Sequence, residues 1–460
     1  MFPRFRWPVL VVACSLGGGL ALAQGANENS WSGFQGGPAH LGTFADTRLR
    51  PPLRVLWRAS PPGDGRLSPV ALSRNAGFAT APNAVVRFRV SNGAIEWRVP
   101  RAPGPLIPPV IDSGFGRAGT VIFAEGSRQR DAAVRAVDAI SRRTRWTARV
   151  GPVGFGGPTA AEGRVFVGTT RQSVVGIDAR SGSVLWTVRT DGVVNTAPAV
   201  ADGRVFAVSE NRQNGRTTLY AMRAGGCGSP TCPPLWRFSP EGIALGTSAP
   251  AVSGSTVYVG FGDTGVRAID AATGGVRWTG NVRRLFSPRT APAITGNELY
   301  VLDGIGGLYR FDARTGRRLW DHQFPAIVTS AAPLVVPGRP STIFVGLDDG
   351  TVAGIQGDNG HLRWQTKAGS APIAAFAATA TDTEAMLLVP VVGRRGGIHA
   401  YVHDPRGRLV DQESPTVLDL ARALRNFAVA SVPLVAVLLA FFRFLPRREP
   451  TATPTGTSSS

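Results

Sequence analysis

The histidines and two closely spaced cysteines are the residues of this sequence best suited to hold a metal ion. Cys227 and Cys232 lie in GGCGSPTCPP, and no histidine lies nearby to complete a zinc site. A local disulfide in an oxidising compartment is the favoured interpretation, with metal ligation and free thiols as alternatives. Neither HExxH nor another paired metal-binding spacing occurs among the five histidines, which are His40, His322, His361, His399 and His403.

Nucleophilic and phosphate-binding motifs are also lacking in the sequence. The glycine-rich stretch GPVGFGG at 151–157 is not followed by the Lys-Ser/Thr pair of a phosphate-binding loop. Neither GxSxG nor a convincing Ser/His/Asp arrangement is present. The sequence therefore predicts no catalytic residue, and the residues that recur along it need a structural explanation.

One motif recurs at a regular pitch through most of the chain. The segment AIDAATGGVRW at 268–278 returns as RFDARTGRRLW at 310–320, with an Asp and with a Gly four residues before the Trp. Periods of 40 to 50 residues separate successive tryptophans of the series and are typical of propellers or helical arrays. The series consists of Trp57, Trp97, Trp146, Trp186, Trp236, Trp278, Trp320 and Trp364, and only Trp7 and Trp31 lie outside it.

Each repeat reads as four short β-strands. A small-residue strand such as TAPAV is followed by a Gly or Asn turn, an aromatic and β-branched strand such as STVYVG, a third strand such as GVRAID, and the Trp strand. Four strands in about 44 residues correspond to one propeller blade. The predicted fold is therefore an all-β propeller of four-stranded antiparallel blades.

The repeated Asp, Gly and Trp have mechanical roles in such a blade. An Asp at the end of the third strand can accept hydrogen bonds from turn amides, the Gly supplies the positive φ of a tight hairpin, and the Trp lies on the outermost strand, where it packs on the next blade. The predicted turn residues are Asp178, Asp270, Asp312, Gly93, Gly182, Gly274, Gly316 and Gly360.

The two ends of the repeat region predict how the ring closes. Residues 53–59 form a Trp strand without three strands before it, whereas residues 372–404 form three strands without a Trp. Joining the two gives eight blades over residues 53–412 and leaves no free sheet edge at the seam. The alternative is that residues 408–410 supply the missing outer strand and 53–59 lie elsewhere.

Residues 268–278 match AxDxxTGxxxW, and on this motif the chain resembles the pyrroloquinoline quinone (PQQ) propeller repeat family over roughly residues 31–410. The stretch WSGFQGGPAHLG at 31–42 resembles the segment that precedes the first blade in that family, so residues 24–52 are interpreted as an entry segment. The family includes quinoprotein dehydrogenases and non-catalytic propellers, among them the lipoprotein of the outer-membrane β-barrel assembly machinery.

Membership of the enzyme branch would imply PQQ and Ca²⁺ at the ring axis, a catalytic Asp, carboxylate ligands and usually a disulfide between adjacent cysteines. This chain has no adjacent cysteines, and its candidate carboxylates are dispersed, whereas calcium needs converging oxygens. We therefore expect no cofactor and a non-catalytic module that binds an envelope protein, peptide or glycan; a PQQ- and Ca-dependent dehydrogenase is the alternative. The candidates are Glu125, Asp131, Glu210, Asp263, Asp303, Asp348 and Asp349.

The termini predict export and a membrane anchor. Residues 1–23 have the pattern of a secretory signal peptide; a lipidated Cys14 and an uncleaved anchor are alternatives. A helix is expected over 414–445 with a membrane span at about 426–443, followed by a disordered cytoplasmic tail at 446–460. A helix packed on the domain is the alternative for this segment. The propeller itself is expected outside the cytoplasm, tethered to the cytoplasmic membrane.

The charge is strongly basic, with 50 Lys and Arg residues against 30 Asp and Glu. A GC-rich genome would account for the arginines; attraction to anionic lipid or wall polymers is the functional interpretation. Because the arginines are scattered through every repeat, nucleic-acid binding is not expected. We expect a monomer.

Overall fold

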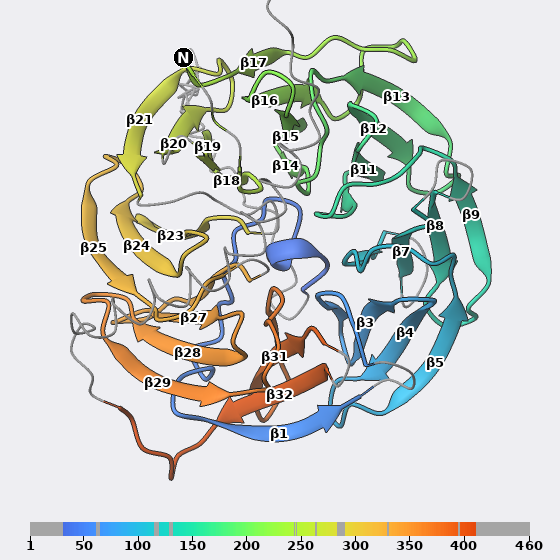
Figure 1. The fold of residues 1–460 in the computed structure, drawn as a ribbon. Coiled ribbons are helices and arrows are strands. Elements are labelled where there is room, and N and C mark those ends of the chain that lie inside the picture. Colours follow the sequence, from blue (N-terminus) through green and yellow to red (C-terminus); the bar gives the residue numbers. More distant parts are fainter. Residues whose placement is uncertain are drawn as a thin grey trace, which may run out of the picture.

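A computed structural model describes residues 31–410 except 61–64, 115–118, 128–131, 243, 245, 263–264, 283–289, 329–330 and 394–395. The described residues form 32 strands and one 3-10 helix, η1 (Phe34–Gly36). The strands make eight four-stranded antiparallel sheets arranged in a ring around a central axis (Figure 1). The predicted all-β, eight-bladed propeller is confirmed.

Blades 1 to 7 each run from an inner to an outer strand in sequence order. In the first four blades the strands are β2 (Ala71–Ser73), β3 (Ala76–Ala81), β4 (Ala84–Arg89) and β5 (Ile95–Pro100); β6 (Val110–Asp112), β7 (Thr120–Glu125), β8 (Ala133–Asp138) and β9 (Thr144–Ala148); β10 (Thr159–Ala161), β11 (Arg164–Thr169), β12 (Ser173–Asp178) and β13 (Val184–Arg189); and β14 (Ala199–Ala201), β15 (Arg204–Asn211), β16 (Arg216–Arg223) and β17 (Trp236–Phe238).

The remaining blades repeat this order, except that the eighth is built from both ends of the domain. Blades 5 to 7 consist of β18 (Ala251–Ser253), β19 (Thr256–Phe261), β20 (Gly265–Asp270) and β21 (Val276–Asn281); β22 (Ala293–Thr295), β23 (Glu298–Leu302), β24 (Gly307–Asp312) and β25 (Arg318–Gln323); and β26 (Leu334–Val336), β27 (Thr342–Gly346), β28 (Thr351–Gln356) and β29 (Leu362–Lys367). Blade 8 consists of β30 (Ala377–Ala380), β31 (Ala385–Val391), β32 (Gly397–His403) and β1 (Leu53–Ala59).

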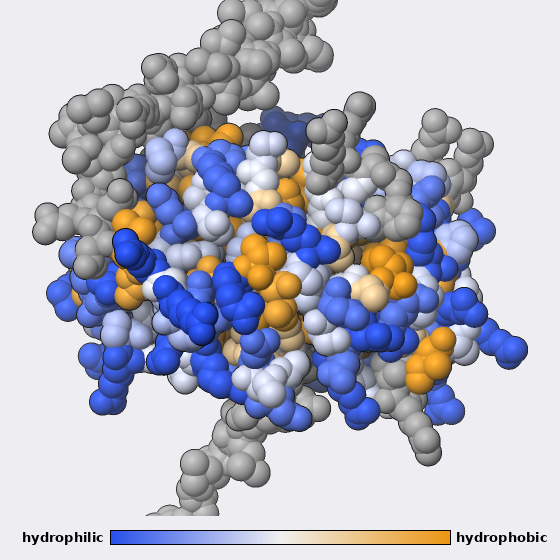
Figure 2. All heavy atoms as spheres, turned by 90° about the horizontal axis from the view of Figure 1, so that it is seen from below, coloured by the Kyte–Doolittle hydropathy of each residue, from blue (hydrophilic) through white to orange (hydrophobic). Residues whose placement is uncertain are grey.

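Burial along the strands follows their distance from the axis. The second strand of a blade is covered on both faces by neighbouring blades, so every residue of β19 is buried. The outer strand β13 lies at the rim and keeps only Trp186 and Val188 buried. Sheets covered on both faces read as continuous apolar and β-branched runs, which explains why the second strand of each repeat is the most hydrophobic. The side of the disc is mostly hydrophilic, with small separate apolar patches (Figure 2).

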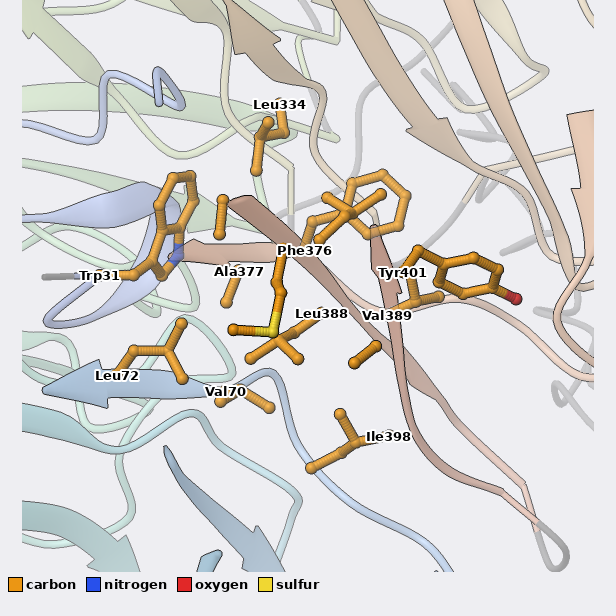
Figure 3. Packing of buried hydrophobic residues seen from close by; sticks show 14 of the residues in the cluster. Trp31, Val70, Leu72, Leu334, Phe376, Ala377, Leu388, Val389, Ile398 and Tyr401 are labelled. Carbon is orange, nitrogen blue, oxygen red and sulfur yellow. The ribbon is translucent and has the colours of Figure 1, made fainter. Parts of the chain in front are cut away.

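Strand β1 closes the ring by pairing with β32, with Leu53 opposite His403 and Ala59 opposite Ile398. This is the predicted closure. The alternative that residues 408–410 complete blade 8 is wrong, because the amide of Val410 donates to the Arg363 carbonyl of β29 in blade 7. Beside the seam, one hydrophobic core cluster contains Leu72 of blade 1, Leu334 of blade 7 and Tyr401 of blade 8 (Figure 3).

Several predictions concern residues outside the described part of the chain. The signal peptide at 1–23, the helix at 414–445 with its membrane span, and the tail at 446–460 all belong to this group. Among the described residues no helix has the length and apolar character needed to cross a membrane.

Candidate functional site

The ring axis is occupied by residues 31–44 of the chain's own entry segment. Helix η1 lies at the centre of the ring (Figure 1), and the segment crosses the inner strands of six blades. In each of these blades the amide of the middle residue of the inner strand donates to an entry-segment carbonyl, at 2.7 to 2.9 Å. The pairs are Leu72 to Trp31, Ile111 to Ser32, Val200 to Pro38, Val252 to Ala39, Ile294 to Leu41 and Val335 to Gly42.

Phe34 fills the axis between blades. Its side chain is buried in a cluster with four alanines that precede the inner strands of blades 4, 5, 6 and 8. Alanine at these positions leaves room for one aromatic ring, since a larger side chain on every blade would overfill the centre. The alanines are Ala197, Ala249, Ala291 and Ala375.

Two polar side chains of the entry segment are buried beside Phe34. His40 is 1% exposed, its ring lies 5.1 Å from that of Phe34, and its Nδ1 lies 3.0 Å from the Pro250 carbonyl. Gln35 donates from Nε2 to the Ala291 carbonyl at 3.3 Å. Burial lowers the pKa of His40 to about 4, although the bond to Pro250 acts in the opposite direction. His40 is therefore neutral at pH 7, and Nδ1 carries the proton that Pro250 accepts.

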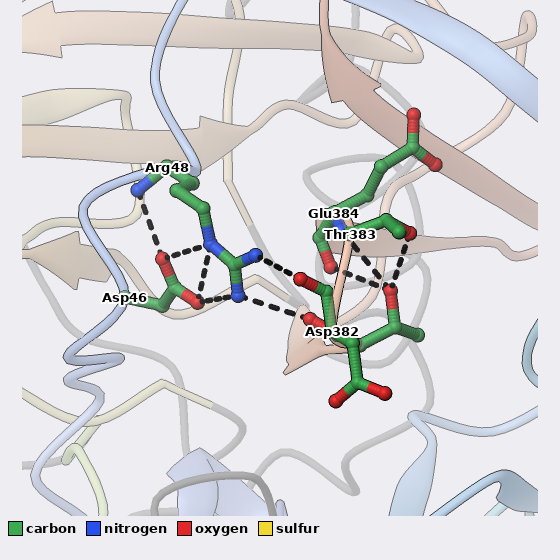
Figure 4. A network of polar contacts seen from close by, with 6 residues as sticks. Asp46, Arg48, Asp382, Thr383 and Glu384 are labelled. Atoms are coloured by element: carbon green, nitrogen blue, oxygen red, sulfur yellow. Dashed lines mark hydrogen bonds and ion pairs between the residues drawn. The ribbon is translucent and has the colours of Figure 1, made fainter.

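A polar network fixes the outer end of the entry segment on blade 8 (Figure 4). The Arg48 guanidinium pairs with Asp46 at 2.6 Å and donates to the carbonyls of Thr381 and Asp382 in the hairpin between β30 and β31. The bond from Arg48 lowers the pKa of the Asp46 carboxyl, against the effect of partial burial. The entry segment is thus attached both at the axis and at the seam where the ring closes.

The predicted carboxylates do not converge on this axis. Glu125 pairs with Arg135 at 3.3 Å in blade 2, Glu210 accepts from the Gly246 amide in blade 4, and Asp349 pairs with Lys367 in blade 7. Asp348 lies beside Asp349, while Asp131 and Asp263 lie outside the described residues.

Asp303 is the most deeply buried of these carboxylates. It is 1% exposed and accepts bonds from the amides of Ile305 and Gly307 and from the Tyr309 hydroxyl. Its oxygens stabilise the turn between β23 and β24. Glu125, Glu210, Asp303 and Asp349 thus bond within their own blades or to the link with the neighbouring blade, and they do not form the converging oxygen set that Ca²⁺ requires.

The histidines are similarly separated. His322 lies in β25, His399 and His403 lie in β32, and His361 lies in the turn before β29. Burial lowers the pKa of His322 and of His399 to about 4. No group of three or more His, Cys, Asp or Glu side chains able to hold a metal ion occurs within the described ranges.

Cys227 and Cys232 form the predicted disulfide. The bridged loop belongs to blade 4, but it reaches the outer edge of blade 3. The Thr187 amide of β13 donates to the Pro230 carbonyl at 2.8 Å, and the Cys232 amide donates to the Thr187 carbonyl at 3.0 Å. The loop therefore covers part of an edge strand that would otherwise present unpaired backbone groups.

The repeated tryptophans lie on the outer strands and reach the following blade. In seven of them the indole Nε1 donates to a backbone carbonyl there, at 2.8 to 3.2 Å. Trp364 contacts the Tyr401 ring of blade 8 at 6.1 Å. The seven pairs are Trp57 to Val90, Trp97 to Ala139, Trp146 to Ala179, Trp186 to Ala224, Trp236 to Ala271, Trp278 to Ala313 and Trp320 to Gly357.

The turn glycines lie directly against these tryptophans, and the turn aspartates bond to amides of the same turns. Oδ1 of Asp270 accepts from the amides of Ala272 and Thr273, and Asp178 and Asp312 make equivalent bonds in their own turns. The bond from Arg277, followed by the bonds from Thr273, lowers the pKa of Asp270. Positive φ occurs at Gly93, Gly182, Gly274, Gly316 and Gly360.

Two polar groupings had no recognisable signal in the sequence. Asp191, between blades 3 and 4, accepts from the hydroxyls of Ser209 and Thr218 at 2.5 and 2.7 Å. Burial alone would raise its pKa, but these bonds lower it. The buried Arg101 donates to carbonyls of blades 1 and 2, including Ala81 at 2.7 Å. In both groupings these hydrogen bonds hold neighbouring segments together.

Comparison with known proteins places this arrangement in a family. The family model described as outer membrane protein assembly factor BamB matches residues 130–225 and 229–412, together more than half of the chain. BamB from Moraxella catarrhalis is similar in structure, with a TM-score of 0.58 and 16% identity, over 78% of this chain and 99% of that one. Among curated proteins no sequence matches this chain.

Two quinoprotein structures share the same fold. A europium-containing methanol dehydrogenase has a TM-score of 0.67 and 12% identity, over 82% of this chain and 98% of that one. Quinohemoprotein alcohol dehydrogenase ADHIIG from Pseudomonas putida HK5 has a TM-score of 0.63 and 12% identity, over 85% and 82%. Sequence identities this low establish similarity of fold alone. The activities of the two enzymes and of the assembly factor are therefore not assigned to this chain from these structures.

Proposed function

Because this chain belongs to the family described as outer membrane protein assembly factor BamB, we propose that it is a non-catalytic propeller that binds or scaffolds an envelope protein, peptide or glycan. In this proposal the chain is exported by its N-terminal segment and held by a C-terminal helix in the cytoplasmic membrane, as a monomer with its propeller outside the cytoplasm. In this proposal the partner binds to the exposed rim and loops, and the protein has no reaction centre.

The observation that carries the proposal is the occupied axis. Phe34 fills the axis, and carbonyls of the entry segment accept hydrogen bonds from the inner-strand amides of six blades. The resemblance to quinoproteins would place PQQ at this same axis. A planar cofactor would have to displace a segment that makes six backbone bonds and buries two aromatic side chains, Trp31 and Phe34. Four of the candidate calcium ligands in the described part of the chain, Glu125, Glu210, Asp303 and Asp349, also lie on four separate blades and bond to nearby protein groups.

The alternative is a PQQ- and Ca-dependent dehydrogenase, which the quinoprotein-like fold keeps open. A direct assay of the full-length protein in detergent distinguishes the two functions. PQQ and Ca²⁺ are added, cofactor absorbance is titrated, and dye reduction is followed with a panel of alcohols and sugars. We expect neither saturable cofactor binding nor turnover; saturable binding with turnover would replace the proposal with the alternative.

The binding role has its own test. A photo-crosslinking amino acid placed at exposed rim positions such as Leu235 or Val276 in cells would capture a partner that touches the rim. Mass spectrometry would then identify it, with the exposed Gln213, in the β15–β16 turn at the other end of the strands, as the comparison. Capture of the same envelope component at neighbouring rim positions, and not at Gln213, would support a binding module. Reporter fusions at residues 413 and 460 would test the predicted membrane topology.

A further inference from the structure

Three asparagines of this chain are followed directly by glycine. Asparagine side chains are among the thermolabile groups of proteins. Before glycine, the next backbone nitrogen reaches the side-chain carbonyl carbon with the least steric hindrance, because glycine has no Cβ atom. The three pairs therefore share one intrinsic chemistry, and a difference in their reactivity must come from the fold. They are Asn92-Gly93, Asn214-Gly215 and Asn359-Gly360.

The three pairs are also alike in their local geometry. Each asparagine is exposed and each glycine is buried, and the φ values of Gly93, Gly215 and Gly360 are +72°, +72° and +75°. In each pair the asparagine Oδ1 accepts a hydrogen bond, at 3.0 to 3.1 Å, from the backbone amide two residues later. A donor at this oxygen stabilises the negative charge that develops there when the carbonyl carbon is attacked.

The glycine nitrogens differ in their hydrogen bonding. The Gly93 amide donates to the Arg89 carbonyl at 2.8 Å, and the Gly360 amide donates to the Gln356 carbonyl at 2.9 Å. Among the described residues the Gly215 amide has no such acceptor. Attack on the side chain requires this nitrogen to lose its proton and to turn toward the carbonyl carbon. At Gly93 and Gly360 a backbone hydrogen bond must therefore break first.

Neighbouring blades hold the same two turns in place. A Cβ atom at Gly93 would lie 2.5 Å from Cε3 of Trp57, and one at Gly360 would lie 2.8 Å from Cε3 of Trp320. An indole ring of the preceding blade thus covers each of these glycines. The backbone rotation that closes a ring between asparagine and glycine has to open this contact as well, so it requires local unfolding of the turn.

The Asn214 turn lies at the other end of its blade. In blade 4 the glycine against the repeated tryptophan is Gly226, where a Cβ atom would lie 2.5 Å from Cδ1 of Trp186, and it follows β16. Asn214 and Gly215 precede β16 and connect it to β15. With eight residues in each strand, these two form the longest hairpin in the described part of the chain. The turn at its tip is therefore not the one that Trp186 covers.

We propose that Asn214 is a site of spontaneous deamidation and that it reacts faster than Asn92 and Asn359. The deprotonated Gly215 nitrogen attacks Cγ of Asn214, the C–N bond of the side-chain amide breaks, and ammonia leaves with a proton returned by water, which gives a cyclic succinimide. Water then opens the ring at either carbonyl and yields aspartate or isoaspartate. Water enters and ammonia leaves, so neither an oxidant nor a cofactor is needed.

The modification changes the hairpin tip in two ways. Either product adds a negative charge between Arg212 and Arg216 in the sequence, and isoaspartate also lengthens the backbone by one methylene group. This change goes beyond the proposed binding role and does not depend on it.

The test measures the three sites in one sample. Full-length protein in detergent is incubated in mildly alkaline buffer and digested at intervals under acidic conditions, and mass spectrometry gives the deamidated fraction of each peptide. Methylation by an isoaspartate methyltransferase identifies the isoaspartate product. The same time course in urea measures intrinsic reactivity, because the unfolded chain lacks the turn bonds and the indole contacts. Asn214→Gln is the matched variant, since it keeps the amide but closes a ring more slowly, and circular dichroism confirms that it folds.

We expect Asn214 to deamidate at least about tenfold faster than Asn92 or Asn359 in the folded protein, and the three rates to agree within about threefold in urea. In Asn214→Gln the fast reaction should disappear, with unchanged rates at Asn92 and Asn359. Equal rates at the three sites of the folded protein overturn the inference. A preference for Asn214 that persists in urea also overturns it, because the preference would then come from sequence and not from the fold.

Discussion

The glycine of each repeated turn meets two physical demands at one position. Gly316 has a φ of +74°, and a Cβ atom built there would lie 2.6 Å from Cδ2 of Trp278 in the preceding blade. Gly182 and Gly360 lie in the same relation to Trp146 and Trp320. A side chain at these positions would therefore strain the turn and also push the indole ring away from its carbonyl partner.

The two demands can be separated with a pair of glycine substitutions. Gly316→Ala is expected to lower the free energy of unfolding by about 2 to 4 kcal/mol, since overpacking adds to the backbone strain. Gly163→Ala, at a φ of +69° with no atom within 4 Å of the new Cβ, should cost about 1 kcal/mol. Urea denaturation followed by circular dichroism measures both. Equal losses would mean that the contact with Trp278 carries no stability.

Buried histidines predict how stability changes with pH. The pKa of His40 in the folded protein is about 4, against an ordinary value of 6.5. Between these values the unfolded chain binds a proton that the folded chain does not, so stability falls as pH falls from 6.5 to 4. His322 and His399 share this behaviour. His40 should therefore account for about one third of the stability that the histidines lose between pH 6.5 and pH 4, and its own share is at most about 3 kcal/mol.

His40→Asn tests this contribution, because Asn tolerates the φ of 56° and keeps a donor for Pro250. We expect the variant to be less stable than wild type by about 1 to 2 kcal/mol at pH 7, through lost packing on Phe34. The difference should vanish between about pH 6 and pH 5 and reverse sign by pH 4, because only wild type loses stability through His40. Urea titrations at several pH values give the two curves. Phe34→Leu should give a curve parallel to wild type, and a parallel curve for His40→Asn would refute the assignment.

At the scale of elements, the disulfide loop stabilises an edge of its neighbour. The loop closed by Cys227 and Cys232 holds Pro230 and Cys232 against Thr187 of β13. The outer strand of blade 4 itself is short, because β17 comprises only Trp236–Phe238. The loop therefore lies in the sequence of blade 4, but its backbone hydrogen bonds also attach it to blade 3.

Replacing Cys227 and Cys232 together by Ser should lower the free energy of unfolding by about 2 kcal/mol, the chain-entropy value for so short a loop. Dithiothreitol should destabilise wild type by a similar amount and leave the variant unchanged. Hydrogen exchange of a peptide covering β13 should increase in the variant, because the loop is then held less firmly at Thr187. An unchanged β13 would show that the loop does not protect this edge.

The strands, turns, blade number and ring closure could be predicted from the sequence because each depends on local patterns that repeat. The alternation of turn glycines and β-branched runs defines strands, and the Trp spacing defines blades. The path of the entry segment could not be predicted, because residues such as Trp31 and Gly42 bond to strands up to about 300 residues away and have no periodic pattern. The alanines before the inner strands were the one available signal of a filled axis.

The candidate site was less predictable than the fold for the same reason. Gln35 and His40 meet the carbonyls of Ala291 and Pro250 only because the closed ring brings the inner ends of blades 5 and 6 to the axis. Asp303 could be placed in a turn by its DGIGG context, but its burial and its bond to Tyr309 depend on the folded blade. These contacts depend on the three-dimensional packing of the chain, which a repeat pattern does not encode.

At the scale of the whole molecule, the entry segment connects blades that do not touch one another. Its carbonyls accept from blades 1, 2, 4, 5, 6 and 7, and Arg48 fixes it to blade 8. A ring held only by neighbouring contacts could open one blade at a time. A central segment bonded to most of the blades adds coupling between distant ones, so the inner strands are expected to lose protection together.

Phe34→Ala tests this coupling by creating a cavity on the axis, at an expected cost of about 3 to 5 kcal/mol. Hydrogen exchange measured by mass spectrometry should then increase in peptides covering β14, β18 and β22 alike, because Val200, Val252 and Ile294 donate to the segment that Phe34 anchors. Leu319→Ala, at a residue of the outer strand β25 that is 37% exposed, is the control and should change the exchange of these peptides little. Faster exchange confined to one inner strand would mean that the segment fills space on the axis without coupling the blades.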